Sequence, residues 1–130
     1  MSTQQNKAPM QQFVNLKNND QILQLLHADF MANQPNGTQD REAFLQHMNH
    51  FNTAFSDTFF TIEGQVAEGD TVVTYGKWGG THSGEFRGIA PTGKQIAISA
   101  VIIDRFEDCR IIEHRGQFDM FGIMQQLDLV

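Results

Sequence analysis

The closing segment of the chain, EHRGQFDMFGIMQQL at residues 113–127, places Asp119 between Phe118 and Met120. An ionised carboxylate is costly to bury among apolar side chains. Asp119 could therefore cap a last helix, because aspartate is a favoured N-cap residue. It could also be kept in a dry pocket for proton transfer, since apolar surroundings make a carboxylate a stronger base. The two roles are compatible, and the spacing leaves both open.

Two further candidates, Trp78 and His82, share the parity of one expected strand. His82 precedes a glycine-rich loop. It could donate a hydrogen bond to a substrate oxygen, or it could hold the loop in place. Trp78 could line a pocket wall, or it could be an ordinary core or interface aromatic. We treat both as candidate substrate-binding residues.

Three more candidates lie on the last two expected strands. Arg105 could form a salt bridge between strands or anchor a polar group of a substrate. His114 precedes Asp119 by five residues, so strict alternation puts the two on opposite faces unless Gly116 marks a bulge. Arg115 has the parity of Asp119. On the same face as Asp119, Arg115 could favour the ionised form of the Asp119 carboxylate. It could instead pair with Glu113 or bind an acidic substrate.

The sequence has no motif for nucleophilic catalysis, phosphate binding or metal binding. Ser83 and Ser99 do not lie in a strand–turn–helix elbow, and Cys109 lies in an expected tight turn, so no nucleophile stands out. The chain has no glycine-rich phosphate loop. His47 and His50 are three residues apart without a matching carboxylate motif, so we expect no metal site. Acid–base chemistry without metal or cofactor remains.

Hydrophobic periodicity changes from helical to strand-like halfway along the chain. The first half predicts a short helix with Pro9 in its first turn, and helices over 18–30 and 40–54 that flank a loop at 33–40. The second half predicts two strands within 58–82, a long connection at 83–94, strands at 95–106 and 111–118 around a tight turn, and a short closing helix. Helices followed by antiparallel strands indicate an α+β fold.

Composition limits the class of protein. The 130 residues fit a single domain, and the formal net charge is −6. A nucleic-acid binder needs a basic face, and so does docking on an anionic membrane, so we expect neither partner. The single cysteine excludes an internal disulfide and favours the cytoplasm. The strand ISAVIIDRF is apolar on both parities, so a partner chain should cover one face, which predicts a homodimer.

A combination of motifs over residues 80–127 resembles the SnoaL-like polyketide cyclases, also called ester cyclases. The chain carries GTH at 80–82, GEF at 84–86, GI and PTGK at 88–94, DRF at 104–106, EH at 113–114, Asp119, and QQL at 125–127. Weaker similarity extends over the first helices. Where the family commonly has tryptophan after the EH pair, this chain has Arg115.

The resemblance implies the cone-shaped α+β fold of the nuclear transport factor 2 superfamily, with a curved antiparallel sheet enclosing a pocket. It also implies that Asp119 is the acid/base of an intramolecular aldol ring closure, with a small carbonyl compound as substrate. The same cone serves isomerases, dehydratases and non-catalytic binders of apolar ligands. These alternatives stay open, and Arg115 argues against an ordinary polyketide substrate.

Overall fold

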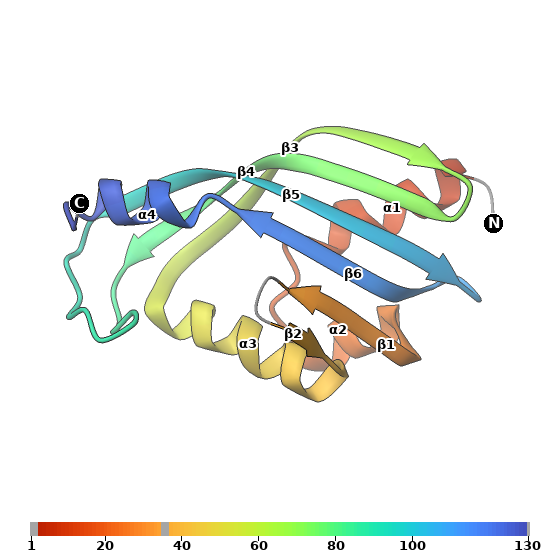
Figure 1. Ribbon diagram of the computed structural model, residues 1–130, viewed down its shortest axis with the longest axis horizontal. Helices are drawn as coiled ribbons and strands as arrows, with labels where there is room; N and C mark the ends of the chain where they lie inside the picture. Colours follow the sequence, from red (N-terminus) through yellow and green to blue (C-terminus); the bar gives the residue numbers. More distant parts are fainter. Residues whose placement is uncertain (1–2, 35–36, 130) are drawn as a thin grey trace.

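The computed structural model describes residues 3–34 and 37–129 and confirms an α+β fold. A curved six-stranded sheet in the order β2-β1-β6-β5-β4-β3 wraps over the N-terminal helices (Figure 1). The helices are α1 (Thr3–Phe13), α2 (Asn19–Leu25), α3 (Arg41–Ala54) and α4 (Met120–Gln126). The strands are β1 (Leu26–Gln34), β2 (Gly37–Gln39), β3 (Phe55–Glu68), β4 (Thr71–His82), β5 (Gln95–Glu107) and β6 (Arg110–Phe118).

The four long strands β3 to β6 form an antiparallel meander, in agreement with the antiparallel strands expected for the second half of the chain. On β5 the even-numbered residues are buried on the concave face, and the odd-numbered ones lie on the convex face. Because side chains alternate across a strand, one register fixes which residues reach the interior. No helix among the described residues is long and apolar enough to cross a membrane.

The prediction of one helix over residues 18–30 is wrong for the second half of that range. α2 ends at Leu25, and β1 follows at once and pairs in parallel with β6. Leu26 and Phe30 are four residues apart, a spacing that fits one helix face and one strand face equally well. Ala32 completes the buried strand face. The expected loop at 33–40 is shorter, because β2 pairs with the end of β1; residues 35–36 lie outside the described part.

The third helix is confirmed. Asp40 is its N-cap, and its side chain accepts a hydrogen bond of 2.9 Å from the backbone N–H of Ala43. α3 crosses the open side of the sheet (Figure 1), and its residue Phe44 is buried in the core. In the first helix, Pro9 lies in the interior rather than in the first turn, because α1 begins several residues earlier than expected.

The hairpin between β5 and β6 contains one extra residue. Next to its turn, Phe106 pairs with Ile111. The following pair joins Arg105 to Glu113, so Ile112 has no partner on β5. Such a bulge changes the face of every later residue of its strand relative to an unbroken register.

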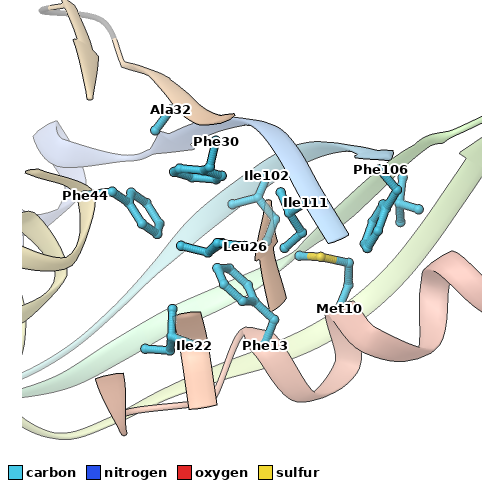
Figure 2. Close-up of a cluster of buried hydrophobic side chains, with 11 residues drawn as sticks. Met10, Phe13, Ile22, Leu26, Phe30, Ala32, Phe44, Ile102, Phe106 and Ile111 are labelled. Carbon is cyan, nitrogen blue, oxygen red and sulfur yellow. The ribbon is translucent and has the colours of Figure 1, made fainter. Parts of the chain in front are cut away.

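Two apolar clusters fill the interior. The larger cluster lies between α1, α3 and the sheet, where Phe13, Phe30 and Phe44 gather and the side chain of Met10 extends toward Ile111 (Figure 2). The smaller cluster lies at the other end, where Ile123 of α4 clusters with Phe55 and Phe86. The space between the clusters is the site described next.

Candidate active site

A cavity of about 330 Å³ opens between the two clusters. Its walls come from the α1–α2 connection, α3, the concave face of the sheet and the start of α4. Small-molecule sites have this size and are usually apolar and aromatic. Seven aromatic side chains line it: Phe13, Phe44, Phe51, Phe59, Phe60, Trp78 and Phe118.

The most enclosed polar group of the cavity wall is His114. Its Nδ1 lies 2.5 Å from Oδ1 of Asp104, which is fully buried on the neighbouring strand. The rings of Phe13, Phe30 and Phe44 surround the imidazole, with centroids 5.0–6.4 Å away. Since a carboxylate only accepts hydrogen bonds, His114 Nδ1 must donate. In the neutral imidazole, Nε2 then carries the free lone pair.

Gly116 leaves space beside this nitrogen. It follows His114 on the concave side of β6 and also lines the cavity. A Cβ atom at position 116 would lie 3.6 Å from His114 Nε2 and 3.2 Å from a ring carbon of Phe118. Any larger side chain would fill the approach to the imidazole. The arrangement presents a base, oriented by a buried carboxylate, to a ligand in an apolar space.

The basic residues of the lining come from several elements. Lys17 and Arg87 line the cavity, together with the imidazoles of His47 and His114. Lys17 Nζ donates a 2.7 Å hydrogen bond to the carbonyl of Thr58. Within the described residues, the lining contains no Asp or Glu.

The pKa of His47 is lowered from its ordinary value of 6.5. The largest cause is partial loss of solvent around the ring, and the positive charges of His50, Arg87 and His114 add to it. Burial and neighbouring basic groups thus both favour the neutral imidazole of His47.

His82 lies outside the cavity lining and is fully buried. Its Nδ1 is 2.9 Å from Thr92 Oγ1 and accepts a longer hydrogen bond from the Thr92 backbone N–H. The backbone of His82 also bonds Gly93 and Lys94. These contacts hold the 83–94 connection in place, which is the second of the two roles that the sequence left open.

Trp78 does line the cavity. Its ring makes edge contacts with Phe51, Phe55 and Phe118, at centroid distances of 5.4–6.1 Å. Its place on the concave face follows from the alternation of β4. Of the candidates from the sequence, Trp78 and His114 are the two that the structure brings together around this space.

Asp119 is the N-cap of α4. Its Oδ1 accepts a 2.9 Å hydrogen bond from the Gly122 backbone N–H, and the side chain is exposed. Its chain neighbours Phe118 and Met120 both line the cavity, so the carboxylate lies at the rim.

Arg105 and Arg115 lie on the convex face. Arg105 donates a 2.7 Å hydrogen bond to Glu113, its partner across the strands, and both side chains are about half exposed. This pair lowers the pKa of Glu113 and raises that of Arg105, and in each case the mutual hydrogen bond is the largest cause. Arg115 is exposed and pairs with Ile103.

One cluster could suggest a metal. His27 Nε2 lies 3.5 Å from Glu107 and 3.9 Å from Asp108, beside the β5–β6 turn. However, His27 Nδ1 accepts a hydrogen bond from the backbone N–H of Asp29. The neutral ring therefore carries its proton on Nε2 and donates toward Glu107, which explains the cluster without an ion.

Sequence reasoning missed Asp104, Gly116, His47 and Arg87 as parts of the site. Asp104 was noted only within the DRF motif, and Arg87 only within a flexible connection. A buried aspartate amid the branched residues of an apolar strand was the signal available for Asp104, since such a carboxylate needs a partner. The other three depend on contacts between distant segments.

Several solved structures of other proteins have the same fold as this chain. AclR, a candidate hydroxylase from Streptomyces galilaeus, superposes with a TM-score of 0.91 over 99% of this chain and 84% of its own, at 24% identity. IdmH, a candidate polyketide cyclase from Streptomyces antibioticus, gives 0.85 over 98% and 99% of the two chains, at 26% identity. A candidate polyketide cyclase from Acidithiobacillus ferrooxidans gives 0.81 over 98% of each chain, at 28% identity.

No curated protein matches the chain. The sequence model described as SnoaL-like polyketide cyclase matches residues 7–127. That match spans both clusters, the cavity wall and the α4 cap. The fold, the enclosed aromatic space and the family match agree, and the chain belongs to the SnoaL-like polyketide cyclase family.

Proposed function

We propose that this protein is a cofactor-independent enzyme of the cyclase type, which transfers protons on a small carbonyl compound held in the aromatic cavity. The observation that carries the proposal is the Asp104–His114 pair, in which a buried carboxylate orients an imidazole toward that space. Such a pair favours one tautomer and stabilises the imidazolium that forms when the ring takes a proton.

The reaction needs one base and one acid. His114 Nε2 takes a proton from the carbon next to a carbonyl, which leaves an enolate and an imidazolium. The enolate carbon bonds to a second carbonyl carbon of the same molecule, whose oxygen becomes an alkoxide. The alkoxide receives a proton, and the product is a ring with the same atoms as the substrate. The aromatic walls fold the substrate and exclude water.

Asp119 is the second proposed acid/base group, as the family resemblance implies. Its position between two cavity-lining residues supports a role at the rim, where its carboxylic acid form would protonate the alkoxide. Asp119 then regains a proton from water, and the His114 imidazolium releases its proton to water. The cap and the chemistry can be separated, because asparagine caps helices as well as aspartate does. Asp119→Asn should therefore keep α4 in place and remove the acid.

The test measures proton abstraction directly. A phenyl 1,5-diketone is incubated in D₂O, and NMR follows both the loss of the α-proton signal and the appearance of the signals of the cyclic product. General acid–base groups contribute about 10²–10⁴-fold. We expect His114→Gln to lower α-proton exchange by at least about 100-fold. Asp119→Asn should lower ring closure more than exchange.

The main alternative is a binder without catalysis. The exposed cap position of Asp119 favours it. If the wild-type protein never exceeds the buffer rate for any carbonyl compound, and a bound ligand is released unchanged, the binder is correct and the enzyme proposal fails. Exchange without ring closure would indicate an isomerase or dehydratase.

We also propose a homodimer formed through the convex face. Val66, Tyr75, Val101 and Ile103 are exposed there on adjacent strands, with exposed fractions of 37–59%. Apolar side chains that gather on one sheet face usually mark an interface. The convex Arg105–Glu113 pair would lie at its edge.

A further inference from the structure

The charge of the cavity is opposite to that of the protein. The chain has 15 acidic and 9 basic side chains, yet within the described residues the lining has two basic side chains and no acidic one. His47 also lines the cavity, and even a neutral imidazole can donate one hydrogen bond to an anion. A cavity for a neutral ligand needs no such arrangement, whereas clefts of one sign attract ligands of the other.

Arg87 is the best placed of the two cations. It occupies a two-residue turn, closed by hydrogen bonds of 3.0 and 2.8 Å between Phe86 and Ile89. Arg87 and Gly88 both have positive φ, 49° and 81°, which defines a type I′ turn. Asparagine, aspartate and glycine are the residues favoured at the first of these positions, so the arginine is not there for the turn itself.

The guanidinium of Arg87 is held but not neutralised. Its central carbon lies 5.4 Å from the centroid of the buried Phe86 ring, a cation–π contact. Over residues 3–34 and 37–129, no carboxylate forms an ion pair with it. His82 fixes the connection that carries this turn. The hydrogen-bonding edge of the guanidinium is thus available at the cavity.

His47 lies close enough to Arg87 for the charge of the arginine to reach its ring. An anion placed between the two would balance the guanidinium and let the imidazole donate a hydrogen bond. Planar carboxylates match the fork of an arginine better than other anions of similar size. Three aromatic rings line the same cavity, and the ring of Trp78 is nearly perpendicular to those of Phe51 and Phe118.

We propose that the cavity binds aromatic carboxylic acids, with the carboxylate on Arg87 and His47 and the ring system between Phe51, Trp78 and Phe118. This inference rests on the proposed function in one respect only: if the protein is an enzyme, aromatic carboxylic acids are the class of substrate that this cavity takes. Binding itself requires no turnover, so the two proposals can fail separately.

The test compares acids with their methyl esters. The chain has one tryptophan, and Trp78 lines the cavity, so its fluorescence reports occupancy. The probes are benzoate, 2-naphthoate and 4-phenylbenzoate, each with its ester, at neutral pH. We expect at least one acid to bind about tenfold or more tighter than its ester, which is the usual size of a charge-assisted hydrogen bond.

Arg87→Asn is the matched variant, because asparagine suits a type I′ turn and the loop should still fold. It should reduce acid binding about tenfold and leave ester binding within about twofold. Arg110→Asn removes the same charge from the β5–β6 turn and should change neither. Arg87→Lys keeps the charge without the fork and should fall between wild type and Arg87→Asn.

Three results would overturn the inference. The first is that no acid binds more tightly than its ester, or that none of the probes binds at all. The second is that Arg87→Asn and Arg110→Asn behave alike. The third is that Lys17→Gln, and not Arg87→Asn, abolishes the preference for acids. If the esters bind as tightly as the acids while the diketone still exchanges its α-protons in the presence of the protein, the proposed function stands and this inference fails.

Discussion

Replacing Asp104 by asparagine tests the proposed mechanism with little change of shape. In the wild type, Oδ1 of Asp104 accepts the proton of His114 Nδ1 at 2.5 Å. The other carboxylate oxygen, Oδ2, is buried and has no hydrogen-bond partner among the described residues. An asparagine fits the same space in either of two orientations, and each changes the imidazole.

The size of the effect follows from these orientations. If the amide oxygen faces Nδ1, the tautomer is kept but the hydrogen bond loses its charge, which costs about 1–1.5 kcal/mol, or about 5–12-fold. If the amide nitrogen faces Nδ1, the proton moves to Nε2 and the base is lost. The analogous change in a Ser-His-Asp triad lowers kcat by about 10⁴-fold. We expect Asp104→Asn to lower α-proton exchange by about 10-fold to 10⁴-fold.

Stability should respond less than activity. Most single substitutions cost about 0.5–3 kcal/mol, and domains have about 5–15 kcal/mol in reserve. Urea denaturation should therefore show a folded variant. Nitrogen-15 NMR of the imidazole reports which ring nitrogen carries the proton. Asp108→Asn, in the exposed β5–β6 turn, is the control for a lost carboxylate.

Two outcomes would refute the reasoning. A folded Asp104→Asn protein that exchanges α-protons at the wild-type rate would remove the carboxylate from the mechanism. A wild-type spectrum with the proton on Nε2 rather than Nδ1 of His114 would show that the imidazole presents a donor, not a base, to the cavity.

Three further predictions concern turn, charge and assembly. Cys109 has a positive φ of 64° in the type I′ turn after β5, so Cys109→Gly should raise the free energy of unfolding in urea by about 1 kcal/mol. Because the Arg105 hydrogen bond lowers the pKa of Glu113, the pair stabilises the fold above the ordinary carboxyl value of 4.5. The stability difference between wild type and Glu113→Gln should shrink as the pH falls below that value and as salt is added; a constant difference would contradict this. Light scattering at micromolar concentration should give a dimer for the wild type and a monomer for Val101→Lys, and a wild-type monomer would exclude the proposed convex interface.

The sequence predicted the parts of the fold that local patterns determine. The strands β3 to β6 are runs rich in β-branched and aromatic residues that are separated by turn residues. The helix α3 has both its cap, Asp40, and its apolar face. β1 was not predictable in this way. Leu26 and Phe30 fit a helix face as well as a strand face, and only pairing with β6, more than 80 residues later, decides between them.

The site depends on a register that no local pattern determines. Counting back from the tight turn, in which Glu107 pairs with Arg110, an unbroken hairpin puts Asp104 opposite Glu113 and turns His114 to the convex face. In that register Arg115 would face the cavity. This is the face on which the sequence places it, because Arg115 and Asp119 are an even number of residues apart.

The extra residue at Ile112 reverses this arrangement. It brings His114 opposite Asp104, leaves Arg115 on the convex face, and aligns Gly116 with the space beside the imidazole. The arginine that departs from the family pattern is therefore separated from the cavity by the sheet. Arg87, delivered by a connection between β4 and β5, supplies positive charge there instead. The preference of this cavity for an acidic ligand thus depends on the turn at 86–89 and not on the substituted position of β6.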